Sequence, residues 1–140
     1  MGWKDVRVGS GQYITLKNDG ERATVVFLGE PYEQIMLAAG GKTKRRYLFN
    51  VGTPENVDKG KSAIFPAGPT VATDIRAALK DGELVGKVSV TLTRRGVSGD
   101  RDTKYELGTP KKLSPAEVKK FAALALVDLA AEPLPSGGKF

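Results

Sequence analysis

The stretch PTVATDIRAALKDGELVGKVSVTLT, residues 69–93, contains the change of hydrophobic period that decides the fold class. Behind Pro69, apolar residues recur at a spacing of four, which predicts a one-sided helix: Val71, Ile75 and Leu79. Gly82 ends this helix, because glycine readily adopts the left-handed conformation found after helix ends. Residues 87–93 then alternate strictly, which predicts a strand with three inward-facing side chains: Val88, Val90 and Leu92.

Strand signals lie on both sides of that helix. Three earlier segments combine β-branched or aromatic residues with turn residues at their ends: 13–16, 23–28 and 44–51. Asn18-Asp-Gly20 is expected to join the first two as a hairpin turn. Residues 62–65 add a short extended piece that Pro66 ends, and residues 103–107 return across a polar turn as the last strand.

A second helix is expected near the end of the chain. Ser114-Pro-Ala-Glu117 is a capping box, which is typical of a helix N-terminus. One apolar stripe follows it: Val118, Phe121, Ala125 and Leu129. Such a stripe requires a partner surface, and the chain's own strands are the nearest.

The elements therefore come as three strands, a helix, two strands and a C-terminal helix. This order predicts a mostly β fold: a five-stranded OB-type antiparallel barrel with a helix between strands 3 and 4 and an added C-terminal helix. An α+β sheet with helices on one side is the alternative. The expected boundaries are an N-terminal extension at 1–12, an OB-fold domain at 13–113, the C-terminal helix at 114–132 and a flexible tail at 133–140.

Composition narrows the function classes. The 140 residues favour one domain, and 22 Lys and Arg against 16 Asp and Glu leave a net charge of +6, which favours a polyanionic partner. The chain has no cysteine, so disulfides and thiolate zinc sites are excluded, and no histidine, the commonest general base. No membrane span or signal sequence is recognised, and we expect a cytoplasmic protein.

Two motifs that suggest catalysis have simpler interpretations. Gly60-Lys61-Ser62 follows a strand as a phosphate-binding loop does, but seven residues separate Gly60 from Gly52 and that loop requires four. Asp100 and Asp102 lie in a glycine-rich turn, where aspartates bond the backbone, and a metal site requires more ligands. We therefore expect no cofactor, no metal and no enzyme activity.

The strand at 44–51 carries the main functional signal. Four cations lead directly into two aromatic residues: Lys42, Lys44, Arg45 and Arg46, then Tyr47 and Phe49. Cations pair with phosphates, and exposed rings stack on unpaired bases. Alternation places Tyr47 and Phe49 on the face opposite Arg46 and Asn50, so simple burial turns both rings inward. A bulge would break that alternation, and base stacking and core packing both remain open for the two rings.

The last predicted hairpin carries a second basic group. Its members are Lys87, Arg94, Arg95, Arg101 and Lys104, with Tyr105 beside them. In an OB barrel, the loop between the last two strands is a usual nucleic-acid contact. The alternative is a solvated hairpin tip that Asp100 and Asp102 partly neutralise. Two basic groups on expected binding elements favour a nucleic-acid interface.

Three segments carry a resemblance to a known family. They are residues 13–21 running on to 26–31, the basic and aromatic segment 44–51, and 93–96 followed by 102–105 and Pro110. Over residues 13–113 the chain resembles the small single-stranded DNA-binding proteins of tailed bacteriophages and related marine viral sequences. The resemblance implies an OB fold that coats single strands, with contacts from these positions: Lys44, Arg45, Arg46, Tyr47, Phe49, Arg94, Arg95 and Tyr105.

The chain also departs from that family. Many members end in an acidic tail that recruits partners, whereas this chain ends Gly-Gly-Lys-Phe140, so tail-mediated recruitment is not carried over. The ligands for the zinc ion of the larger relatives are missing, so zinc is not carried over either.

We thus expect a non-catalytic protein that binds single-stranded DNA with little sequence specificity during replication, recombination or repair. Contacts with replication or recombination proteins, and a homodimer, are left open, and no membrane partner is expected. If the protein is viral, as the resemblance implies, we expect it in the host cytoplasm. The alternatives are an OB-fold RNA-binding protein of the cold-shock type and a phage structural or protein-interaction module that docks through its C-terminal helix.

Overall fold

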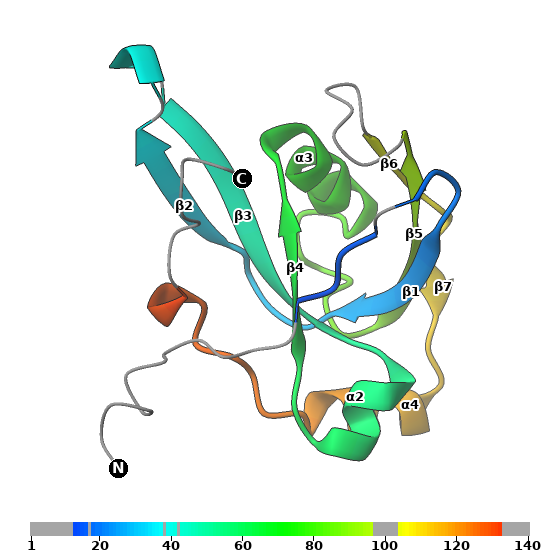
Figure 1. The fold of residues 1–140 in the computed structure, drawn as a ribbon. Helices are drawn as coiled ribbons and strands as arrows, with labels where there is room; N and C mark the ends of the chain where they lie inside the picture. The colour runs from blue at the N-terminus through cyan, green and yellow to red at the C-terminus, as the bar shows by residue number, and fades with distance from the viewer. Residues whose placement is uncertain (1–12, 17, 38, 42, 97–103, 133–140) are drawn as a thin grey trace.

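The computed structural model describes residues 13–132 except Lys17, Ala38, Lys42 and the segment 97–103 (Figure 1). Seven antiparallel strands form one sheet: β1 (Arg22–Phe27), β2 (Tyr32–Leu37), β3 (Thr43–Gly52), β4 (Ala63–Ala67), β5 (Val88–Arg95), β6 (Lys104–Leu107) and β7 (Lys111–Lys112). Three α-helices accompany them: α2 (Pro54–Lys59), α3 (Pro69–Ala78) and α4 (Pro115–Ala122). Two short 3-10 turns complete the list: η1 (Ala39–Gly41) and η2 (Leu129–Ala131).

The sheet is built around β3, whose length lets it pair with three strands. Its first half pairs with β2 from Thr43↔Leu37 to Leu48↔Tyr32, which makes a hairpin that reaches away from the other strands in Figure 1. Its second half pairs with β4, and its last residues pair with β1. The main path runs β2-β3-β1-β5-β6, with β4 on β3 and β7 on β5. Within the described ranges, no ladder joins the two ends of this path.

The main core lies between the curved halves of the sheet and α3. Its centre is a set of edge-to-face rings, with Phe27 5.3 Å from Phe49 and 6.5 Å from Phe65 between ring centroids. Phe65 of β4 also meets Tyr105 of β6 at 5.4 Å. The inward residues predicted for β5, Val88, Val90 and Leu92, are all buried in this core, as is Ile75 of α3.

A second cluster lies where α4 covers the end of β3. Phe121 and Leu124 are buried against Val26 and Leu113. A Cβ atom on Gly52 would come within 2.8 Å of the Phe121 ring, so this close approach requires glycine at that position. The predicted capping box is confirmed, because the Ser114 side chain accepts a hydrogen bond from the Glu117 backbone N–H and the Glu117 carboxylate accepts one from that of Ser114.

The outer face of β3 and β4 is covered by residues 125–132, here called the C-terminal arm. Leu48 and Ile64 are buried there against Val127 and Leu129. Asn50, 5% exposed, is satisfied by the arm: its amide donates to the Val127 carbonyl at 3.0 Å and accepts from the Val127 N–H at 2.9 Å. Ser62 donates a further bond to Asn50 at 2.7 Å. A buried asparagine on the outer face is therefore stable because the arm supplies its partners.

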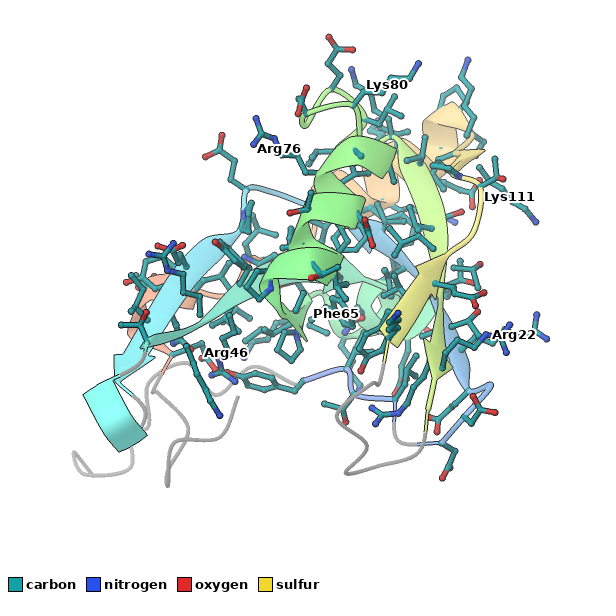
Figure 2. All side chains as sticks on the ribbon, turned by 90° about the horizontal axis from the view of Figure 1, so that it is seen from above. Arg22, Arg46, Phe65, Arg76, Lys80 and Lys111 are labelled. Atoms are coloured by element: carbon teal, nitrogen blue, oxygen red, sulfur yellow. The ribbon has the colours of Figure 1, made fainter. Side chains whose placement is uncertain are left out.

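A polar cluster fixes the end of the arm to the hairpin and to the first described residues. Tyr13 donates to the buried carboxylate of Glu132 at 2.6 Å, and Gln34 of β2 donates to the Glu132 carbonyl at 2.9 Å. Arg46 donates to Gln34 at 2.7 Å and lies 5.9 Å from the centre of the Tyr13 ring. Figure 2 shows Arg46 at the edge of the hairpin, on this side of the molecule.

Much of the predicted fold is confirmed. The structure is mostly β and antiparallel; β1, β3, β5 and β6 lie within two residues of their predicted bounds, and α3 begins at Pro69. The sheet holds seven strands instead of five, and its described strands do not close into a barrel. Two strands, one α-helix and one 3-10 turn were not predicted: β2, β7, α2 and η1. β4 also continues past Pro66 to Ala67. A proline is tolerated there because β4 pairs with β3 along one side, and the described residues add no more than a single bridge, at Ile64.

Two predicted elements are corrected. The segment 13–16 is not the partner of β1: it makes one parallel bridge, Tyr13↔Ile64, whereas Gly20 and Glu21 bond with Arg94 of β5. The helix predicted over 114–132 ends at Ala122. Beyond it the chain is held against residues 60–62, where Ala125 bonds with Gly60 and Ser62. The extended course lets Val127 and Leu129 reach the outer face of the sheet, so tertiary packing overrides a helical composition.

Tyr13 gives the polar cluster a distinct pH dependence. Burial, followed by the hydrogen bond to Glu132, raises its pKa from 10.0 to about 12. The stabilisation that Tyr13 provides is therefore fully present below pH 10 and is lost as the pH rises toward 12. We expect spectrophotometric titration to show a tyrosine step near pH 12 that Tyr13→Phe removes. Loss of absorbance change near pH 10 in the variant, with the step near pH 12 retained, would contradict this assignment.

Replacing Asn50 should uncouple the C-terminal arm from the sheet. Asn50→Ala leaves the Val127 carbonyl and the Ser62 hydroxyl without the partner that Asn50 supplies, and each such loss costs about 1–3 kcal/mol. The Val127 N–H keeps its longer bond to the Ser62 hydroxyl, at 3.2 Å. We expect urea denaturation to show a loss of at least about 2 kcal/mol, against less than about 0.5 kcal/mol for Thr70→Ala at an exposed position. Equal stability of the two variants would show that the arm is not held through Asn50.

Candidate nucleic-acid interface

Lys44 and Arg45 are exposed on the half of β3 that forms the projecting hairpin. Arg45 has one described ion pair, with Glu33 of β2, at 3.9 Å and with side chains 54% and 38% exposed. An exposed pair at this separation contributes little, so Glu33 does not hold Arg45 firmly. Both cations are therefore placed to meet an anion from solution. Lys42, the first cation of the predicted group, lies outside the described residues.

Arg46 differs from its neighbours. It is half-buried on the outer face of the hairpin, where its bond to Gln34 and its position by Tyr13 join β3 to the polar cluster. Its described contacts are structural. The spacing of the cations gave no sign of this, because β2 and the C-terminal arm, which surround Arg46, were not predicted.

The two predicted stacking residues have different surroundings. Phe49 is 4% exposed and packs edge-on against Phe27, so its ring belongs to the core. Tyr47 is half-buried, and its hydroxyl donates a 2.7 Å hydrogen bond to Glu33 that raises the pKa of Tyr47. Alternation along β3 is unbroken here, so Tyr47 and Arg45 share the inner face of the hairpin.

A cleft of about 770 Å³ separates this inner face from α3. Its floor is apolar, with Phe49, Ile75, Leu79 and Val85, and Tyr47 forms part of its wall. Charged side chains of both signs stand at its edge: Glu30 from the turn after β1, Arg76 of α3 and Asp81. Arg76 pairs with Asp81 at 2.8 Å, but both side chains are 76% exposed, so water weakens this pair. Sequence patterns did not indicate the cleft, because β2 and the position of the hairpin opposite α3 were unknown.

The second predicted basic group is divided by the structure. Arg94 is half-buried and donates to the carbonyls of Leu16 at 2.7 Å and Gly96 at 2.9 Å, which fixes the N-terminal segment to β5. Arg95 is exposed and donates to Glu106 at 3.0 Å, which raises the pKa of the Arg95 guanidinium. Lys104 is exposed directly opposite Arg95 in the β5–β6 ladder.

Two further members of that group, Tyr105 and Lys87, do not join Arg95 and Lys104 in one exposed cluster. Tyr105 is half-buried, and its ring meets Phe65 in the core. Lys87 precedes β5 at its opposite end, next to the short strand β7, whose Lys111 is labelled in Figure 2. Arg101 is outside the described residues, as are Asp100 and Asp102.

A further polar surface, not predicted from sequence, covers the outer face of β1, β5 and β6. Cross-strand pairing places Arg22 opposite Thr93 and Thr24 opposite Thr91. The Thr24 and Thr91 hydroxyls are 2.8 Å apart. Figure 2 shows Arg22 on the side of the molecule opposite the hairpin. This face has cations and hydroxyls but no exposed aromatic ring among its described residues.

The interface with the most complete chemistry is therefore the inner face of the β2–β3 hairpin. There, the exposed Arg45, a partly accessible ring and a cleft occur together, with the exposed Lys44 next to Arg45 on the same strand. The helix α3, which contacts both β3 and β6, separates this hairpin from the β5–β6 hairpin (Figure 1). None of the described helices is long and apolar enough to cross a membrane. Among the same residues, no three acidic side chains gather in a way that could hold a metal ion.

Comparison with known proteins adds no further constraint on this interface. The chain matches no protein family, no curated protein sequence and no solved structure.

Proposed function

We propose that the protein binds single-stranded DNA with little sequence preference and without catalysis, through the inner face of the β2–β3 hairpin. The observation that carries this proposal is the order of groups on β3: exposed Lys44 and Arg45, then Tyr47 at the wall of the cleft. Phosphates pair with such cations regardless of sequence, and bases of any kind stack on a ring.

The topology supports an open OB-type barrel. β1 and β2 together pair along one edge of β3, as a single bent first strand does, and β1 also pairs with β5. β3 and β4 then correspond to the second and third strands, α3 to the helix, and β5 and β6 to the last two. The gap between β4 and β6 is spanned by Phe65 and Tyr105 through side chains. In this fold the loops at the two projecting hairpins are the ones that contact oligonucleotides.

The C-terminal arm modifies that picture. OB barrels commonly bind nucleic acid on the outer face of the second and third strands, but here Leu48 and Ile64 of that face are covered by Val127 and Leu129. The uncovered groups on the inner side are Arg45 and Tyr47, while alternation places the exposed Lys44 on the outer face of the hairpin. We therefore assign the binding surface to the inner face of the hairpin.

The alternative of a protein-interaction module loses its main support. It relied on the apolar stripe of the C-terminal helix as a docking element. Phe121 and Leu124 are instead buried against Val26 and Leu113 of the same chain. RNA binding by the same surface is a different alternative, and competition between RNA and DNA oligonucleotides distinguishes it from DNA binding.

Neutralising the two exposed cations should weaken binding to every sequence alike. We expect the double variant Lys44→Gln, Arg45→Gln to bind a labelled 30-nucleotide oligo-dT less tightly in fluorescence anisotropy. Its slope of log affinity against log salt should fall by roughly 1.4, for two lost phosphate contacts on a single strand.

The matched control is Lys119→Gln, Lys120→Gln, which removes the same charge from exposed positions on α4. This control should retain nearly all of the wild-type slope. Equal losses in both double variants would reduce the proposal to a general effect of net charge. Stronger competition by oligo-U than by oligo-dT would reassign the function to RNA, and equal binding to a duplex would remove the preference for single strands.

A further inference from the structure

We propose that the cleft between β3 and α3 is a base-binding subsite, which takes one unpaired base of the bound strand against Tyr47. This inference rests on the proposed single-strand binding. It adds a second element to the site, because it assigns α3, through Ala72, Thr73 and Arg76, to the binding surface.

The lining of the cleft suits a planar, mostly apolar group. The volume of about 770 Å³ lies within the range of small-molecule sites, and an apolar floor with a few polar groups at the edge is typical of them. A base has two apolar faces and a polar edge. Its faces would lie by Tyr47 and the apolar floor, and its edge would meet Thr73 and the charged groups.

The charges at the rim favour a base over a phosphate. Glu30 and Asp81 each bring a carboxylate, whereas Arg76 brings one cation that Asp81 already pairs with. A phosphate would be repelled by the excess of negative charge. A neutral base supplies hydrogen-bond donors to a carboxylate and acceptors to the guanidinium, so both signs of charge are used.

The hairpin provides a phosphate site next to the cleft. Arg45 and Tyr47 are two residues apart on one face of β3, roughly 6.6 Å along the strand. A phosphate held by Arg45 therefore places the attached nucleotide at the entrance of the cleft. In this arrangement Arg45 binds the phosphate of a nucleotide and the cleft binds its base.

The Tyr47 ring is already held in place before any ligand binds. Its hydroxyl donates to Glu33 at 2.7 Å, and its ring packs partly against the main core. Because the side chain has little freedom left to lose, stacking on it costs little conformational entropy.

The test compares oligo-dT with an abasic strand of the same length, which keeps the phosphates and lacks the bases. Ala72→Phe fills the cleft from α3 without changing charge, and the matched control Ala77→Phe makes the same change at an exposed position of α3 outside the cleft lining. We expect Ala72→Phe to bind oligo-dT about 5- to 150-fold less tightly, as the loss of one stacked base predicts. Its affinity for the abasic strand should stay at the wild-type value, and Ala77→Phe should bind both strands as the wild type does.

The possible outcomes separate this inference from the function on which it rests. Full oligo-dT affinity in a folded Ala72→Phe protein would overturn the base-binding cleft and leave single-strand binding intact. A wild-type protein that binds neither strand would overturn the proposed function itself. If Ala72→Phe does not fold, Tyr47→Leu keeps an apolar side chain against the core, and the same selective loss for oligo-dT is required of it.

A binding experiment with free thymidine tests whether the cleft takes a base within a nucleic-acid strand or a free nucleoside. A strand base gains from the neighbouring phosphate contacts at Lys44 and Arg45, so thymidine alone should not occupy the cleft at micromolar concentration. Tight thymidine binding that Ala72→Phe abolishes, without an effect on oligo-dT, would overturn the assignment to a strand base.

Discussion

The strict alternation of side chains along β3 is the constraint on which the rest of the structure depends. Phe49 and Val51 point into the main core, so Leu48 and Asn50 must lie on the outer face. Because β3 also extends past its pairing with β1 and β4 to pair with β2, the same alternation continues into the hairpin. It places Arg45 and Tyr47 on the inner face and Arg46 on the outer one, and a shift of one residue would exchange core and surface along the whole strand.

The outer face that this alternation creates explains the course of the C-terminal arm. Asn50 and Gln34 are both buried, and each bonds a backbone group of the arm, Val127 and Glu132 respectively. Leaving those amides buried without partners would cost about 1–3 kcal/mol each, and the extended course of the chain after Ala122 avoids that cost. The arm therefore covers the outer face of β3 and β4, and the inner side of the hairpin is left accessible.

The parts of the fold that were predictable are those whose pattern is complete within one segment. The alternation of β5 and the spacing of Val71, Ile75 and Leu79 in α3 require no partner to be recognised. β2 was missed because the polar Gln34 interrupts its apolar alternation. Gln34 can be buried because it donates to the carbonyl of Glu132, a residue 98 positions further along the chain. The cleft also depends on contacts between distant segments, so the sequence did not indicate it. Tyr47 was identified as a candidate, but the α3 residues that line the cleft opposite it are brought there by the position of the hairpin.

The same distinction applies to the cations. Arg46 and Arg94 look equivalent to Arg45 and Arg95 in the sequence, yet each bonds neutral groups of the protein, a side-chain amide for Arg46 and two carbonyls for Arg94. The guanidinium suits this work because its several donors bond neutral oxygens in a fixed geometry. Lys44, by contrast, offers a flexible point charge on an exposed strand. A net charge of +6 thus overstates the positive charge available to a polyanionic partner. Part of that charge belongs to Arg46 and Arg94, which connect β3 and β5 to neighbouring segments of the protein.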